Sequence, residues 1–174
     1  MQPKAVQSFP PIIYPQPTLL ILGSMPSVRS LERQEYYGHP RNHFWPLLFA
    51  LAERPPLQDY GQKKLLLKEC GVALWDVLAS CQRLGSADAS ITDRRVNPIS
   101  AFLHRQPTLV AVGFNGREAQ KTFDRHINRQ EFAHITFLEL PSSSPIPTKK
   151  ARNFQEKLRA WQVLRPYLRC SGSA

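Results

Sequence analysis

Short, nearly continuous apolar runs recur along the chain and predict buried strands. Four runs are of this kind, at residues 18–22, 72–77, 108–113 and 134–140. Strands buried on both faces have this unbroken apolar character, whereas strands with one exposed face alternate apolar and polar positions. The four runs therefore predict strands inside a sheet that is covered on both sides.

Segments with helical spacing separate these runs and predict helices at residues 43–53, 97–106, 116–127 and 148–168. Asn97 and Pro98 have the order of an N-cap and a first-turn proline. The last segment has one apolar face, and its other face carries Lys149, Lys150, Arg152, Lys157 and Arg159.

The alternation of apolar strands and helices predicts the fold class. It favours an α/β fold of three layers, α/β/α, with a central four-stranded parallel sheet in a single domain. The chain of 174 residues is long enough for one such core. We expect an extended, proline-rich arm at 1–17, the folded domain at 18–168 and a short tail at 169–174.

The segments that follow the strands indicate where a ligand binds. In open parallel sheets, ligands lie beyond the carboxyl ends of the strands. The corresponding segments are rich in Gly, Ser, Pro and Asn, and we expect them to be loops that converge at one edge: 23–30, 78–91, 114–118 and 141–150.

The charge favours a polyanionic partner. Lys and Arg number 23 against 13 Asp and Glu, which gives a net charge of +10 spread over the folded segments. The apolar runs are too short to cross a membrane, and the first residues lack the apolar core of a signal peptide. We therefore expect a cytoplasmic protein.

The cysteines predict neither a disulfide nor a metal site. Cys70, Cys81 and Cys170 are odd in number and contain no CxxC pair, which argues against a disulfide framework, a zinc site or an iron–sulfur cluster. We expect three free thiols, no metal and no cofactor.

Three loops carry candidate binding groups. Gly23 in GSMPS lets a ligand approach the backbone closely, and Asn115 in FNG either forms a turn or presents an amide. PSSSPIPTKK suits phosphate binding or, alternatively, a polar turn with a helix cap, and its candidate groups are Ser142, Ser143, Ser144, Lys149 and Lys150.

The stretch YYGHPRNHFW, residues 36–45, combines rings with His, Asn and Arg. Nucleobase pockets stack a ring on the base and use amides to contact its edge. Taken singly, each residue has a structural alternative. Asn42 could be a helix N-cap, His39 could be a hydrogen-bonded structural histidine, and at least two of the rings could be core residues. The combination favours a nucleobase site, although no strong catalytic motif such as GxSxG or HExxH is present.

These residues, in this order, resemble the uracil-DNA glycosylase superfamily. The similarity runs through LILGSMPSVRSLERQEYYGHPRNHFWPLL, DVLASCQRLGSADASI, VGFNG and LPSSSP, and covers most of residues 9–165. The hypoxanthine-DNA (DNA-deoxyinosine) glycosylase branch is the most similar. The resemblance implies a four-stranded parallel sheet in an α/β/α fold, and excision of a deaminated base from DNA without a metal.

Two departures from the family pattern concern specificity. Mismatch-specific relatives have an Asn where this chain has Ser24, and many relatives begin the second motif with Asn-Pro-Ser, where this chain has Leu140, Pro141 and Ser142. Both departures favour a purine over uracil. In the hypoxanthine branch the catalytic residue is the Asn of HPRN, which corresponds to Asn42.

The resemblance implies a mechanism in which the base flips out of double-stranded DNA. Asn42 would orient the attacking water, and Tyr37, or else Phe44, would stack on the base. Gly23, Ser24 and Met25, with His39 or Asn115, would contact the base edge. The loop at residues 141–150, here called the serine loop, would hold phosphates, and Ile146 would fill the gap that the flipped base leaves in the duplex.

No lysine occupies a motif position, so we expect a monofunctional enzyme that forms no Schiff base. A monomer is the default expectation for its oligomeric state. A uracil or mismatched-thymine glycosylase, a non-catalytic nucleic-acid-binding module and a nucleoside hydrolase remain as alternatives.

Overall fold

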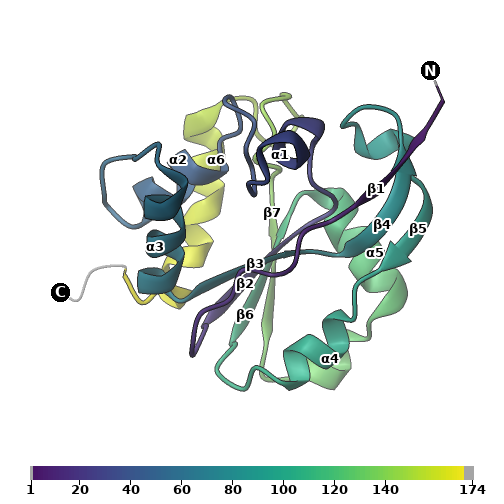
Figure 1. Ribbon diagram of the computed structural model, residues 1–174. Coiled ribbons are helices and arrows are strands. Elements are labelled where there is room, and N and C mark those ends of the chain that lie inside the picture. The colour runs from purple at the N-terminus through teal and green to yellow at the C-terminus, as the bar shows by residue number, and fades with distance from the viewer. Residues whose placement is uncertain (1, 171–174) are drawn as a thin grey trace.

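Four parallel strands form the centre of the computed structural model, which describes residues 2–170 (Figure 1). Their order is β3-β2-β6-β7, with bounds β2 (Leu19–Gly23), β3 (Val72–Asp76), β6 (Ala111–Asn115) and β7 (Thr136–Leu140). Each strand overlaps one of the apolar runs in the sequence. The predicted parallel sheet is therefore confirmed.

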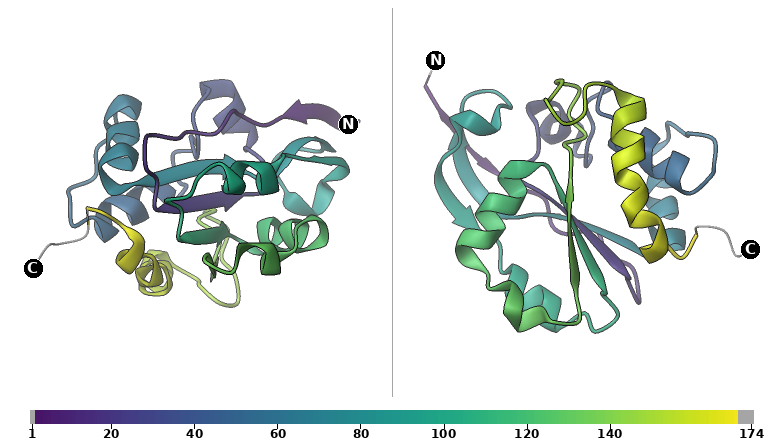
Figure 2. Two further views of the ribbon diagram at one scale, coloured as in Figure 1. Left: turned by 90° about the horizontal axis from the view of Figure 1, so that it is seen from below. Right: turned by 180° about the vertical axis from the view of Figure 1, so that it is seen from behind.

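Helices cover both faces of this sheet, as Figures 1 and 2 show. One face carries α2 (Phe44–Leu51), α3 (Tyr60–Cys70), α6 (Phe154–Trp161) and the 3₁₀ helix η3 (Gln162–Tyr167), and the other carries α4 (Ile99–His104) and α5 (Arg117–His126). Because successive strand residues point to opposite faces, Leu19 packs against the first group of helices and Leu20 against the second. Both side chains are fully buried, which explains the unbroken apolar runs.

A second, antiparallel sheet lies beside the first and was not predicted. It has the order β1-β4-β5, with β1 (Lys4–Gln7), β4 (Leu78–Arg83) and β5 (Thr92–Val96), and the 3₁₀ helix η1 (Asp88–Ser90) between the last two. The expectation of a loop over 78–91 is therefore wrong. β4 has a half-exposed pattern with polar residues, so no apolar run marks it in the sequence.

The proline-rich arm lies along both sheets. Residues 4–7 pair with β4, and Ile12 forms an isolated antiparallel bridge to Leu74 in β3. After β2 comes the short helix α1 (Val28–Arg33), and η2 (Arg129–Phe132) precedes β7. Within the described residues, no helix is long and apolar enough to cross a membrane.

The last helix begins later than its apolar pattern indicates. Asn153 is its N-cap, and the Asn153 side chain accepts a hydrogen bond from the backbone of Glu156 at 2.9 Å. Before it, the backbone N–H of Ala151 donates to the Thr148 hydroxyl at 3.2 Å, which forms a turn. The prediction of a helix start at 148 with two lysines is therefore wrong, because this turn and the cap hold the lysines outside α6.

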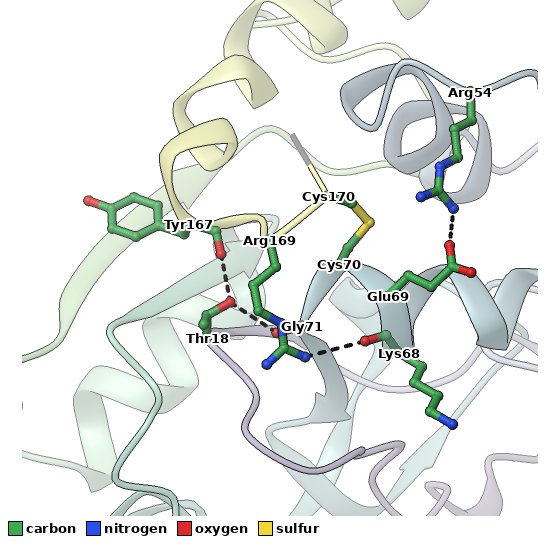
Figure 3. The surroundings of a disulfide bond; sticks show 9 residues. All are labelled: Thr18, Arg54, Lys68, Glu69, Cys70, Gly71, Tyr167, Arg169 and Cys170. Carbon is green, nitrogen blue, oxygen red and sulfur yellow. Dashed lines mark hydrogen bonds and ion pairs between the residues drawn. A yellow bond between two sulfur atoms is a disulfide. The ribbon is translucent and has the colours of Figure 1, made fainter. Parts of the chain in front are cut away.

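A disulfide joins Cys70, at the end of α3, to Cys170 near the end of the chain (Figure 3). The two Cα atoms are 4.5 Å apart, although the residues are separated by 100 positions in the sequence. The backbone N–H of Arg169 donates to the Cys70 carbonyl at 3.0 Å, so the chain end is held there. The expectation of three free thiols is therefore wrong. Cys81 is free and buried.

Candidate active site

The carboxyl ends of the parallel strands bring the predicted site residues together. Gly23 pairs with Asp76, and Asn115 pairs with Leu140, so four strand ends share one edge. The loop after β7, α1 and the beginning of α6 lie together at the top of Figure 1. The predicted convergence is therefore confirmed for three of the four segments, and the fourth continues into the second sheet.

Asp76 is a buried carboxylate at this edge, and only 3 % of its surface is exposed. Its Oδ2 has no hydrogen-bond partner among the described residues. A Cβ on Gly23 would lie 2.5 Å from Asp76 Oδ1 and 3.1 Å from the Tyr37 hydroxyl, which is also buried and unpartnered. Glycine is thus the residue that leaves room for both polar groups.

Burial sets the protonation of these groups. It raises the pKa of Asp76 to about 7, with a further contribution from the Asp88 charge and an opposing one from Arg83. Both forms of Asp76 are therefore populated near neutral pH. Burial, followed by the Asp76 charge, raises the pKa of Tyr37 above its usual range, so its hydroxyl remains a donor.

Tyr37 lies directly on Phe44. Their ring centroids are 4.0 Å apart with an interplanar angle of 20°, and Phe44 is fully buried. Tyr37 has a φ of 53°, in the left-handed region that bulky residues rarely adopt. Phe44 is buried behind the Tyr37 ring, whereas Tyr37 is partly exposed. Of the two candidate stacking rings, Tyr37 is therefore the one that a base can contact.

Asn115 ties the loop after β7 to the end of β6. Its Nδ2 donates to the Ser143 hydroxyl at 2.9 Å, and its Oδ1 accepts from the Ser143 backbone at 2.8 Å. Ser143 is 1 % exposed, so its hydroxyl faces the interior. Ser142 and Ser144 are partly exposed, while Ile146 stands out at 69 % exposure.

Asn42 lies one residue before His43, which is the N-cap of α2 and makes no side-chain cap bond, so the predicted N-cap role of Asn42 is wrong. Asn42 Oδ1 accepts a hydrogen bond from the backbone N–H of Phe44 at 2.9 Å. The backbone N–H of the next residue, His43, donates to the Ser143 carbonyl at 2.9 Å, which places this segment beside the serine loop. A carbonyl oxygen has two lone pairs, so the bond from Phe44 leaves Asn42 Oδ1 able to accept a second hydrogen bond.

His39 lies in the turn that leads to Asn42. Its Nδ1 accepts from the backbone N–H of Arg41 at 3.1 Å, and its carbonyl accepts from the backbone N–H of Asn42 at 2.9 Å. These two hydrogen bonds within the turn fit the alternative that His39 is a structural histidine.

The second sheet supports the loop after β2. The Ser24 hydroxyl donates to Asp88 Oδ1 at 2.8 Å, and Arg83 donates to the Pro26 carbonyl. Met25 is 8 % exposed and packs in a small apolar cluster with Leu78, Cys81 and Ile91. The side chains of Ser24 and Met25 are thus used to hold the loop.

Asp76 was not among the site residues predicted from the sequence. The feature that could have identified it is a single carboxylate at the end of an apolar strand. Asn97 contributes to its support. Instead of capping α4 as predicted, the Asn97 side chain donates to the Asp76 carbonyl at 2.8 Å and to the Ser8 hydroxyl at 3.4 Å. The N-cap of α4 is Pro98, with no side-chain bond, so the predicted cap is wrong.

Lys157 and His43 were also missed as a pair. Lys157 is 1 % exposed, and its Nζ lies 3.2 Å from His43 Nδ1 and donates to the Ser144 carbonyl. The pair joins α6, the beginning of α2 and the serine loop. The sequence pattern places Lys157 on the polar face of the last helix, and the burial of its side chain shows that this placement is wrong.

Comparisons with known proteins agree with this fold and give its family. The family model described as "Uracil DNA glycosylase superfamily" matches residues 10–165. A relative from Methanosarcina acetivorans named "Hypoxanthine DNA glycosylase" is 39 % identical over 114 residues, which cover 65 % of this chain and 72 % of the relative. Another of the same name, from Methanosarcina barkeri, is 38 % identical over 114 residues with the same coverage.

A solved structure gives the same result for the fold. The solution NMR structure of a candidate uracil DNA glycosylase from Methanosarcina acetivorans superposes with a TM-score of 0.77 at 31 % identity, covering 92 % of this chain and 99 % of that one. The fold, the family match and the named relatives together define a DNA glycosylase. The chain belongs to the uracil DNA glycosylase superfamily, which confirms the resemblance noted in its sequence.

Proposed function

We propose that this DNA glycosylase excises hypoxanthine, the base of deoxyinosine, by monofunctional hydrolysis of the N-glycosidic bond after base flipping. The substrate is double-stranded DNA, and the enzyme acts as a monomer in the cytoplasm. The two named relatives support hypoxanthine as the substrate. The observation in this chain that carries the proposal is the buried, unpartnered Oδ2 of Asp76.

Asp76 suits a deaminated base because of the direction of its hydrogen bonds. Deamination of adenine changes N1 from an acceptor into an N–H donor. An ionised carboxylate only accepts, so Asp76 accepts from N1–H of hypoxanthine and faces a lone pair on adenine. A site that leaves a buried polar group unpaired rejects the wrong base strongly.

The base reaches Asp76 through the loop that carries Tyr37. Asp76 is 3 % exposed, so only the edge of the flipped base reaches it, while the face of the base stacks on the partly exposed ring of Tyr37. The Tyr37 hydroxyl lies beside the Asp76 carboxylate, so the edge of a stacked base points toward Oδ2. Backbone amides at Gly23 to Met25 contact the carbonyl of the base.

Asn42 carries the chemistry in this proposal. Its Oδ1, fixed by the bond from Phe44, uses its second lone pair to orient the attacking water. The transition state has oxocarbenium character, and the departing base takes negative charge that the aimed dipoles stabilise. Ser142, Ser144, Lys149 and Lys150 hold the DNA backbone, and Ile146 enters the gap.

The test uses duplexes with a single deoxyinosine, uracil, xanthine or an undamaged base, followed by alkaline cleavage at abasic sites. We expect cleavage at inosine, its loss in Asn42→Ala with DNA binding retained, and no borohydride-trapped adduct. Uracil has the same N–H donor edge, so cleavage at uracil alone would refute the purine preference. Binding without any cleavage would leave a non-catalytic module.

A further inference from the structure

Lys157 makes a contact that the excision chemistry does not require. It is one of the largest fully buried side chains in the domain, yet no carboxylate among the described residues forms an ion pair with it. Its Nζ instead meets two acceptors, the Ser144 carbonyl and His43 Nδ1. A buried lysine without a carboxylate is uncommon and needs a reason.

We propose that Lys157 holds His43 as a neutral imidazole that presents its Nε2–H to a DNA phosphate beside the flipped nucleotide. Lys157 is thus a positioning residue and His43 a DNA-contacting one. The proposal rests on the proposed function only in that the serine loop faces DNA.

The tautomer follows from the donors available. A lysine ammonium has three donors and no acceptor, so the His43 Nδ1 that faces it must accept. The ring proton of the neutral imidazole is therefore on Nε2. Protonation of His43 at Nδ1 would place two cations 3.2 Å apart and would break this bond.

The surroundings of His43 favour the same form. Burial, followed by the Lys157 charge, lowers the pKa of His43, and burial lowers the pKa of Lys157. Lys157 is the charged group that acts on His43; the other neighbours are the Phe154 ring, in edge contact at 5.5 Å, and the uncharged serine loop.

The free nitrogen of His43 lies where a phosphate acceptor fits. The imidazole is partly exposed, and its Nε2 has no partner among the described residues. The His43 backbone is bonded to Ser143, between the partly exposed hydroxyls of Ser142 and Ser144. An N–H donor beside two hydroxyls is a set that phosphate oxygens accept from. Because the His43 imidazole is neutral, its Nε2–H adds a directional hydrogen bond to the phosphate without adding a positive charge.

The first test reads the tautomer in the free, full-length protein by long-range ¹H–¹⁵N NMR of labelled histidines. We expect His43 to be the Nε2–H tautomer and to stay neutral from about pH 8 to pH 5.5, where an ordinary histidine gains charge. In Lys157→Met we expect it to titrate in that range. A wild-type His43 that titrates normally, or carries its proton on Nδ1, would overturn the proposal.

The second test measures fluorescence anisotropy with a duplex that carries a tetrahydrofuran abasic analogue. We expect His43→Phe to bind about 5–10-fold more weakly, the value of one hydrogen bond. Lys157→Met should bind more tightly as the pH falls, whereas wild type should change less. Arg159→Met, which removes an exposed charge from the same helix, is the matched control.

The outcomes separate this proposal from excision itself. Unchanged affinity in His43→Phe would overturn the phosphate contact even if inosine is excised. Retained binding with the expected affinity losses, but without excision of any base, would refute the proposed function and leave the His43 contact standing. If Lys157→Met does not fold, Lys157→Arg should retain the wild-type tautomer, and loss of that tautomer would count against the proposal.

Discussion

Replacement of Cys170 by serine removes the disulfide that joins the segment after η3 to the end of α3. The disulfide closes a loop of 100 residues, and a loop of this length restricts the unfolded chain by about 4.7 kcal/mol in the chain-entropy model. With an unfolding entropy of about 2.1 cal/mol/K per residue, the 174-residue chain gains about 0.37 kcal/mol/K on unfolding. The two values give a decrease in Tm of about 13 °C.

Calorimetric melts of the oxidised wild type, the wild type with reductant and Cys170→Ser measure this shift. Reductant should lower the wild-type Tm as much as the substitution does, and should leave Cys170→Ser unchanged. Cys81→Ser is the matched control, because Cys81 is free and its replacement should leave the response to reductant intact. A change below about 3 °C, with a thiol count that proves the bond was present, would refute the entropic reasoning.

Substitutions at three positions test the edge of the sheet. Asp76→Asn should lower kcat/KM for inosine duplexes about 10–100-fold, because it removes a charged acceptor. The wild-type rate should rise with pH through about 7 as Asp76 ionises, and this limb should vanish in the variant; a persisting limb would assign the titration to another group. Between about pH 4 and pH 7 the folded carboxyl keeps a proton that the unfolded chain has lost. The stability of the wild type should therefore fall as the pH rises through this range, and melts of Asp76→Asn should lack this fall. Gly23→Ala should remove more than about 90 % of the activity, since its Cβ would lie 2.5 Å from Asp76 Oδ1; wild-type activity with a normal circular dichroism spectrum would contradict this geometry. Asn115→Ala should cost about 2–3 kcal/mol in urea unfolding, because it breaks two buried hydrogen bonds to Ser143, and a loss under about 0.5 kcal/mol would show that the loop is held otherwise.

The parallel sheet was predictable because β2, β3 and β6 are buried on both faces and their sequences are almost continuously apolar; β7, at the edge, is partly exposed and its apolar run is interrupted by Glu139. The second sheet was not predictable, since β4 and β5 mix polar and apolar residues without an apolar run, and most of their polar residues are partly or fully exposed. β4 lies between β5 and β1, and β1 is more than 70 residues away in the sequence, so the local pattern of β4 gives no sign of this partner.

The site residues, too, divide into those that the sequence predicts and those that only the fold reveals. Gly23 and Asn115 were predictable from their place at strand ends, and Asn42 from the family motif. Asp76 becomes a candidate only when its burial and missing partner are known, and Lys157 only when α6 is placed against His43. The Cys70–Cys170 bond joins residues whose proximity depends on the complete fold.

The position of β2 has a consequence for synthesis on the ribosome. β2 is the first strand of the parallel sheet to be made, but it lies between β3 and β6, whose pairing begins at residues 72 and 111. At about 5–20 residues per second, β2 waits on the order of 10 s for its second neighbour. During that interval the sequence LLILG has an open edge, so newly made chains are exposed to aggregation and to chaperones before any DNA-binding surface exists.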